Sequence, residues 1–126
     1  MLFGNARPIL PGKLARVRRL DEELEPHRAE YEALNAGYGI RRHVMWISHL
    51  VDGRELWVNV YDMDADDMAR MRGRVWDPDT SAYDRWWLAW VEDVFGVDMR
   101  THHGLAGPPE HLFTWEAATI DGAVPR

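Results

Sequence analysis

Two histidines, His43 and His49, and the pair Asn59 and Tyr61 lie on the two halves of the stretch Ile40–Met63. A histidine titrates near neutral pH and can take or give a proton, and a phenol or an amide can hydrogen-bond a developing enolate oxygen. These residue types therefore predict acid–base chemistry on a carbonyl compound, such as an aldol ring closure. The alternative is that the same polar side chains only satisfy one another at a dimer interface.

The stretch that carries these residues has the pattern of a β-hairpin. Two runs rich in β-branched and aromatic residues flank Asp52-Gly53, which is a strong short-range turn signal. Trp57, Asn59 and Tyr61 share one face of the second strand of the hairpin. With a two-residue turn, the first strand would contribute to that face Trp46, Ser48 and Leu50. A three-residue loop, with Gly53 in the left-handed conformation, would place there instead His43, Met45, Ile47 and His49.

The remaining elements follow from hydrophobic spacing and from turn residues. Before the hairpin, the sequence predicts a strand over 2–10 and a helix over 14–34 with a kink at Pro26. After the hairpin, it predicts helices over 64–72 and 81–95 and a last strand over 110–119. The order β-α-β-β-α-β is typical of the ferredoxin-like α+β fold, which has a four-stranded antiparallel sheet. We therefore expect one domain over 1–119 and a loose tail over 120–126.

Such a sheet has helices on one face only. In the second strand of the hairpin, we expect the aliphatic face of Leu56, Val58 and Val60 to pack on the helices. The other face, with Trp57, Asn59 and Tyr61, would be bare, and a second copy of the chain is the economical cover. The sequence thus predicts a homodimer that encloses a barrel-like cavity. Three tryptophans could stack there on a planar aromatic ligand, or simply pack the interface: Trp46, Trp57 and Trp115.

Composition narrows the function classes. The net charge of −6 disfavours nucleic acid as a partner, and the absence of cysteine excludes disulfides and thiolate chemistry. No apolar run is long enough for a membrane span, and no signal peptide is visible, so we expect a cytoplasmic protein.

Neither a metal nor a cofactor is expected. The His102-His103 pair with His111 lacks the spacing of a metal site, and the acidic run Asp64–Asp67 is better interpreted as a solvated helix start. No phosphate-binding loop or Ser-His-Asp order is present.

Three segments resemble the small tetracenomycin-type aromatic polyketide cyclases: 39–46, 59–71 and 111–116. The opening Pro11-Gly12-Lys13 and the stretch 61–67 also resemble a group of uncharacterised ferredoxin-like proteins. Both resemblances imply a dimeric α+β barrel.

The cyclase resemblance also implies basic and imidazole groups on the hairpin that help to fold a poly-β-keto chain. It favours the register that places His43 beside Asn59 and Tyr61. Arg42 and Met45 are then expected to contact the substrate. The sequence departs from the family at Asn59, where the family has a histidine. The resulting expectation is a cofactor-independent cyclase that guides aldol closure or aromatisation of a hydrophobic polyketone. The alternatives are a cofactor-free monooxygenase of an aromatic intermediate in the same barrel and a non-catalytic dimeric small-molecule-binding protein.

Overall fold

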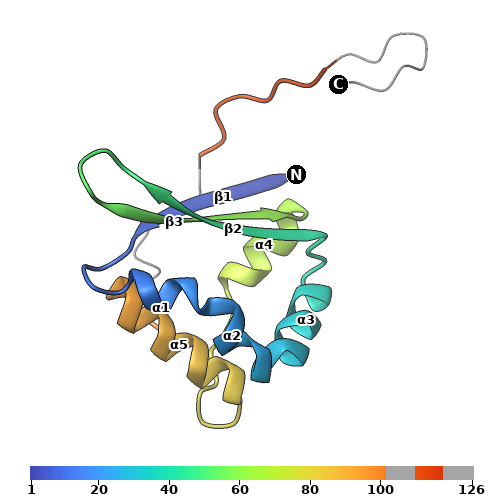
Figure 1. Ribbon diagram of the computed structural model, residues 1–126. Coiled ribbons are helices and arrows are strands. Elements are labelled where there is room, and N and C mark those ends of the chain that lie inside the picture. The colour runs from blue at the N-terminus through green and yellow to red at the C-terminus, as the bar shows by residue number, and fades with distance from the viewer. Residues whose placement is uncertain (102–109, 118–126) are drawn as a thin grey trace.

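The computed structural model describes residues 1–101 and 110–117 and has a mixed α+β architecture (Figure 1). Its sheet has three antiparallel strands in the order β1-β3-β2. These strands are β1 (Leu2–Pro8), β2 (Arg42–His49) and β3 (Glu55–Asp62). The expected α+β class is confirmed, and β1 lies beside β3 as the ferredoxin-like order requires of its first three strands.

The turn between β2 and β3 decides the register of the hairpin. Leu50 N–H donates to the Arg54 carbonyl at 2.8 Å, so the loop consists of the three residues between them, and Gly53 has a left-handed φ of 89°. His43 therefore pairs with Tyr61, and Met45 pairs with Asn59. This is the three-residue alternative, and the preference for it is confirmed.

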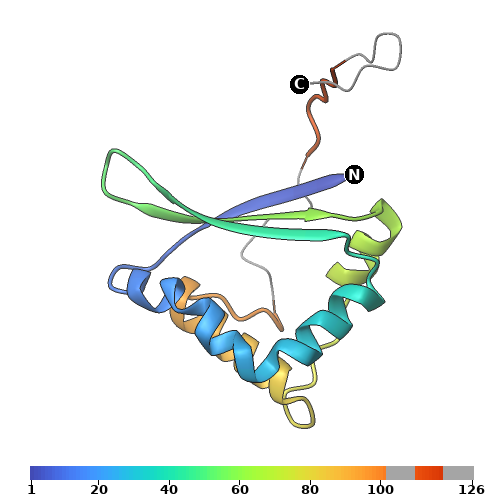
Figure 2. The same ribbon diagram turned by 45° about the vertical axis from the view of Figure 1, so that its right-hand side comes forward.

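The first predicted helix is divided around Pro26. It consists of α1 (Leu14–Arg18), α2 (Leu20–Leu24), the 3₁₀ turn η1 (Glu25–His27) and α3 (Arg28–Gly37). Proline lacks the N–H that an unbroken helix would use and its ring clashes with the preceding turn, so the axis changes direction there. In Figure 2, α1 and α2 lead away from the sheet and α3 returns to it, which gives the helical layer a V shape.

Two further helices, α4 (Ala65–Arg72) and α5 (Ala82–Phe95), agree with the predicted ranges. Ser81 caps α5 by accepting a hydrogen bond from Asp84 N–H at 3.1 Å, and Gly96 ends the helix with a φ of 71°. Asp64 occupies the N-cap position of α4, but its carboxylate binds Arg41 instead of the helix backbone.

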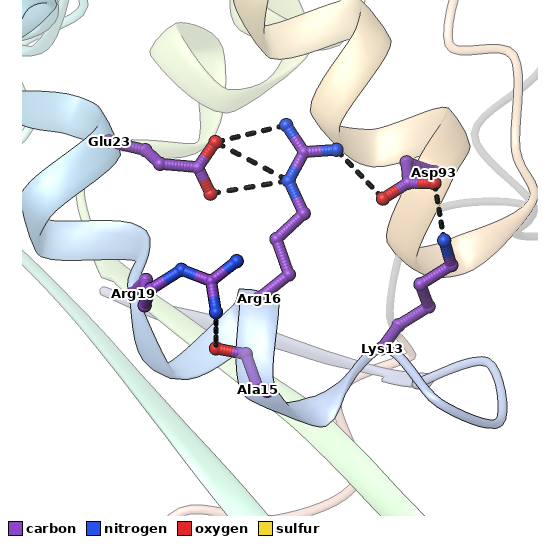
Figure 3. A network of polar contacts seen from close by, with 6 residues as sticks. All are labelled: Lys13, Ala15, Arg16, Arg19, Glu23 and Asp93. Carbon is purple, nitrogen blue, oxygen red and sulfur yellow. Dashed lines mark hydrogen bonds and ion pairs between the residues drawn. The ribbon is translucent and has the colours of Figure 1, made fainter.

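All the helices lie on one face of the sheet (Figures 1 and 2). The core between them is built on α5 and on Trp57 of β3, together with Ile9, Val17, Trp90, Val91, Val94 and Phe95. Figure 3 shows how charged residues hold α1 and α2 against α5: Asp93 accepts from Lys13 and from Arg16, each at 2.7 Å. Arg16 also binds Glu23 at 3.0 Å, so one guanidinium joins α1, α2 and α5.

The expected assignment of the two sheet faces is wrong. Trp57 and Asn59 are only 4% and 3% exposed and face the helices, so strand alternation places Val58 and its aliphatic neighbours on β3 on the open face. Large aromatic rings bury more apolar area than valine does. Trp57 contacts the rings of Trp90 and Phe95. The side chains on this face of β3 thus fill the space between the sheet and the large residues of α5.

The expected fourth strand is also not found. Residues 110–117 have no regular secondary structure and extend on the side of the sheet opposite the helices (Figures 1 and 2). Leu112, Phe113 and Trp115 are all more than 70% exposed there. Alternation alone does not make a strand, because a strand needs a neighbouring edge to supply its hydrogen bonds. The end of the predicted strand and the predicted tail over 120–126 lie outside the described residues.

Candidate functional site

A cavity of about 160 Å³ lies between the sheet and the helices. Its wall is mainly apolar and aromatic, with side chains from all three strands and from α2, α3, α4 and α5. An apolar core cavity of roughly 150 Å³ is large enough to bind benzene. The space therefore suits a compact ligand of one or two rings.

Polar groups gather in the part of the wall where β2 and β3 meet α3. The hydroxyl of Tyr31 lies 2.5 Å from His43 Nδ1, and the amide oxygen of Asn59 contacts His43 Nε2. The Tyr61 ring stacks on the imidazole, with centroids 4.1 Å apart and planes within 13°. Because antiparallel pairing places His43 opposite Tyr61, the hairpin register itself creates this stack.

Burial determines the protonation of these groups. It lowers the pKa of His43, an effect that the hydrogen bond from His43 Nε2–H to the Asn59 oxygen partly opposes, so the imidazole is neutral at pH 7. With an amide oxygen at Nε2, the proton resides on Nε2, and Nδ1 accepts the Tyr31 hydroxyl. Burial also raises the pKa of Tyr31 and of Tyr61, which keeps both phenols protonated. The cluster is thus a neutral base between one donor, the Tyr31 hydroxyl, and one acceptor, the Asn59 amide oxygen.

Three other polar atoms of wall residues are buried and have no hydrogen-bond partner among the described residues. They are Asn5 Oδ1, an acceptor, and Trp57 Nε1 and Arg74 Nε, which are donors. Such groups cost free energy when they stay unpaired in a protein interior. A ligand that offers one acceptor and one donor would relieve that cost, which favours a binding role for the cavity.

The structure brings together five of the nine predicted site residues: His43, Met45, Trp57, Asn59 and Tyr61. The other four do not line this cavity: Arg42, Trp46, His49 and Trp115. Strand alternation places Arg42 and Trp46 on the open face, where Trp46 is 52% exposed. His49 is exposed at the turn end of β2, and Trp115 belongs to the exposed segment 110–117.

Sequence reasoning missed several residues of the wall, among them Tyr31, Arg7 and Arg72. Tyr31 was assigned only to the apolar stripe of its helix, and Arg7 and Arg72 were not considered. A usable signal existed in β1, where Phe3, Asn5 and Arg7 alternate with small residues and share the face of Trp57. No comparable signal marks Arg72, because its position depends on where α4 lies against the sheet.

The described residues contain no group of three or more histidine, aspartate or glutamate side chains that could hold a metal ion. The aspartates at the start of α4 face arginines, since Asp64 binds Arg41 and Asp67 binds Arg70. His102 and His103 lie outside the described residues. Of the helices that can be described, none has both the length and the apolar character to cross a lipid bilayer.

Comparison of the chain with protein-family models, with curated proteins and with solved structures finds no match in any of the three.

Proposed function

We propose that this chain is a cofactor-independent enzyme that binds a compact, hydrophobic ketone beneath its sheet and moves a proton on it. The observation that carries the proposal is the contact of His43 Nδ1 with the Tyr31 hydroxyl in the wall of a mainly apolar cavity, where burial lowers the pKa of His43. A base whose pKa lies at or below the working pH is ready to accept a proton. The apolar surroundings strengthen each hydrogen bond to the reacting atoms.

The proton would travel through Tyr31. Its oxygen takes a proton from the carbon next to the ketone while its own proton passes to His43 Nδ1, 2.5 Å away. The C–H bond breaks, an O–H bond forms, and the electron pair moves to the carbonyl oxygen as an enolate. Tyr61, still protonated, is the nearby donor for that oxygen. Return of the proton at another atom gives tautomerisation, and attack of the enolate carbon on a second carbonyl gives aldol closure.

The cyclase resemblance supports cyclisation or aromatisation of a polyketone as the overall reaction. The cavity volume of about 160 Å³ favours a substrate that forms one or two rings over a longer chain. Restraining such a chain in a reactive conformation can itself contribute many kcal/mol, so a single histidine relay is sufficient acid–base machinery.

Deuterium exchange tests this proposal without knowledge of the natural substrate. In D2O, 2-tetralone, a two-ring ketone, should exchange its C1 protons faster with the protein than without it, as followed by proton NMR. Both His43→Gln and Tyr31→Phe should lower the exchange rate at least tenfold, since each interrupts the relay. His49→Gln should keep the rate, because His49 is exposed and does not line the cavity.

A non-catalytic binding protein is the second candidate. It is favoured by the pairing of both ring nitrogens of His43 with protein groups, which a structural histidine also shows. Quenching of tryptophan fluorescence by 2-tetralone reports binding, since Trp57 and Trp87 line the cavity. Binding without faster exchange would favour this candidate, and the absence of both would contradict any function at the cavity.

We also propose that the chain forms a homodimer through the open face of its sheet and that a ferredoxin-like fold underlies it. The open face is largely apolar, with Trp46 beside Val44, Leu56, Val58 and Val60. Residues 110–117 lie on the same side of the sheet (Figure 1), and the apolar side chains of Leu112, Phe113 and Trp115 are more than 70% exposed there. In a dimer these two surfaces would cover each other, but the cavity would remain within each protomer.

A further inference from the structure

The outer edge of β1 has no partner strand in the described part of the chain. In the sheet order β1-β3-β2, β1 pairs with β3 on one side only. Ile9 N–H donates to the Glu55 carbonyl at 2.9 Å, so odd-numbered residues here direct their backbone groups toward β3. Because these directions alternate along an antiparallel strand, the even-numbered residues of β1 direct their N–H and C=O groups outward. Those with both groups are Leu2, Gly4 and Ala6.

The side chains along this edge leave room for a further strand. Strand alternation places Leu2, Gly4 and Ala6 on the open face, where glycine has no side chain and alanine has only a methyl group. Pro8 ends the edge, because proline has no N–H to donate. β2, the strand at the other edge of the sheet, carries Arg42 on the open face, and a charged side chain on an edge discourages pairing. β1 is therefore the edge at which strand addition is favoured.

The segment 110–117 lacks the partner that this edge could provide. Its residues alternate as those of a strand do, with His111, Phe113 and Trp115 on one side, yet it has no regular secondary structure. Both aromatic side chains are mostly exposed. In Figures 1 and 2 the segment leads away from its own sheet, on the side opposite the helices. Eight residues of strand span about 27 Å, which is enough to run the whole length of β1.

We infer that the segment 110–117 of one copy pairs with the outer edge of β1 in a second copy, so that each sheet receives its fourth strand from its partner. This inference rests on the proposed homodimer and names the surfaces through which the two copies join. Exchange between copies is supported by two observations. The segment extends away from its own sheet, and the edge that could satisfy its backbone groups is unpaired in each copy.

The exchanged strand would also extend the packing of the open face. With Phe113 and Trp115 directed toward that face, their rings lie beside Gly4 and Ala6, the positions with the smallest side chains. An aromatic ring beside an edge glycine supplies packing that the glycine lacks. Four such rings, two from each copy, would bury roughly 600 Å². The surface that they cover doubles this area to about 1,200 Å², which is the lower limit for a stable protein–protein interface.

Hydrogen exchange of the wild-type protein tests the pairing without any substitution. The amide protons of Leu2, Gly4 and Ala6 should exchange at least tenfold more slowly in the dimer than in the dilute monomer, as followed by nuclear magnetic resonance. The reason is that an amide bonded to a neighbouring strand exchanges only when that bond opens. Light scattering defines the two concentrations. The amide of Val51, in the exposed turn between β2 and β3, is the control and should exchange equally fast at both.

Disulfide trapping tests whether the segment comes from a second copy. The chain has no cysteine, so introduced thiols can react only with each other. Ala6→Cys is combined in turn with His111→Cys, Phe113→Cys or Trp115→Cys in the full-length protein. Directly opposed residues of such a pair have Cα atoms about 5.5 Å apart, which suits a disulfide. On mild oxidation, at least one combination should form a covalent dimer, and mass spectrometry should show position 6 linked to the segment.

The matched control places the first cysteine on α3, at an exposed alanine. Ala29→Cys, combined with the same three substitutions, should form a covalent dimer at least tenfold more slowly. Thermal unfolding of each variant verifies that it folds.

The outcomes separate this inference from the proposed function. A covalently closed monomer would overturn the exchange, because the segment would then pair with β1 of its own chain. A dimer whose β1 amides exchange as fast as those of the monomer would overturn it as well. A chain that stays monomeric at every concentration would contradict the proposed dimer together with this inference. Failure of the protein to accelerate deuterium exchange of 2-tetralone would contradict only the proposed reaction.

Discussion

The two faces of the sheet are made from the same three strands and have opposite roles. The face beneath the helices combines a solid aromatic core around Trp57 with the polar cluster of His43 and Asn59. The open face carries aliphatic residues and Trp46, which is 52% exposed. The face that looks less like a core in the sequence is therefore the one that is buried.

This contrast shows that polarity alone does not identify the buried face of a strand. Asn59 and His43 can be buried because each supplies a hydrogen bond that the other needs. Trp57 fits there because α5 presents aromatic partners at matching positions, among them Trp87, Trp90 and Phe95. Valines on the open face are small enough to remain partly exposed at modest cost.

The largest expected effect comes from truncating the matched tryptophans of the two faces. Trp57→Ala should lower the free energy of unfolding by about 3–5 kcal/mol, because it leaves a cavity in the core. Trp46→Ala should cost less than about 1.5 kcal/mol, since half of its surface is already in water. Urea unfolding, at a protein concentration low enough to keep the chain monomeric, measures both. Equal losses would contradict the assignment of the faces.

A smaller effect should follow from placing a charge on the open face. Val58→Lys should weaken self-association at least tenfold, because two lysines would be buried near each other if the open faces of two copies meet. Light scattering over a range of concentrations measures the change. Thr101→Lys, an exposed position outside the sheet, is the matched control and should leave association unchanged. A wild-type chain that stays monomeric at all concentrations would contradict the dimer.

The smallest effect concerns pH. Because burial lowers the pKa of His43, the unfolded chain takes up a proton near pH 6.5 that the folded protein still excludes. The free energy of unfolding should therefore decrease as the pH falls below about 6.5, until the folded pKa is reached. Above about pH 7, His43 contributes no pH dependence.

Urea titrations between about pH 5 and pH 8 measure this dependence. His43→Gln should have a shallower slope than the wild-type protein, whereas the exposed His49→Gln should match it. A His43→Gln slope equal to that of the wild type would show that His43 is not held neutral by burial.

Much of the fold was predictable because its signals are local. Asp52-Gly53 marked the hairpin, Pro26 marked the break in the first helix, and Ser81 and Gly96 marked the ends of α5. Each of these residues acts through its own backbone or through neighbours a few positions away. The register also followed once the three-residue loop was preferred.

The errors concern contacts between distant segments. Which face of β3 is covered depends on the volumes that α5 presents, and the alternation of Trp57 and Val58 does not contain that information. Alternation in 110–117 likewise predicted a strand without supplying a partner edge. Tyr31 reaches His43 only because the chain folds back after Pro26, so the relay could not be read from the hairpin alone.

The break at Pro26 has a consequence for how this scaffold could change. A straight rod over 14–37 would run about 36 Å in one direction and could not both leave the sheet and return to it. The bend at η1 divides the rod into two arms, one that leads away from the sheet and one that returns to it (Figure 2). Because the backbone sets this path, residues of the cavity wall that lie outside the core cluster could be exchanged for a different ligand at little cost in stability.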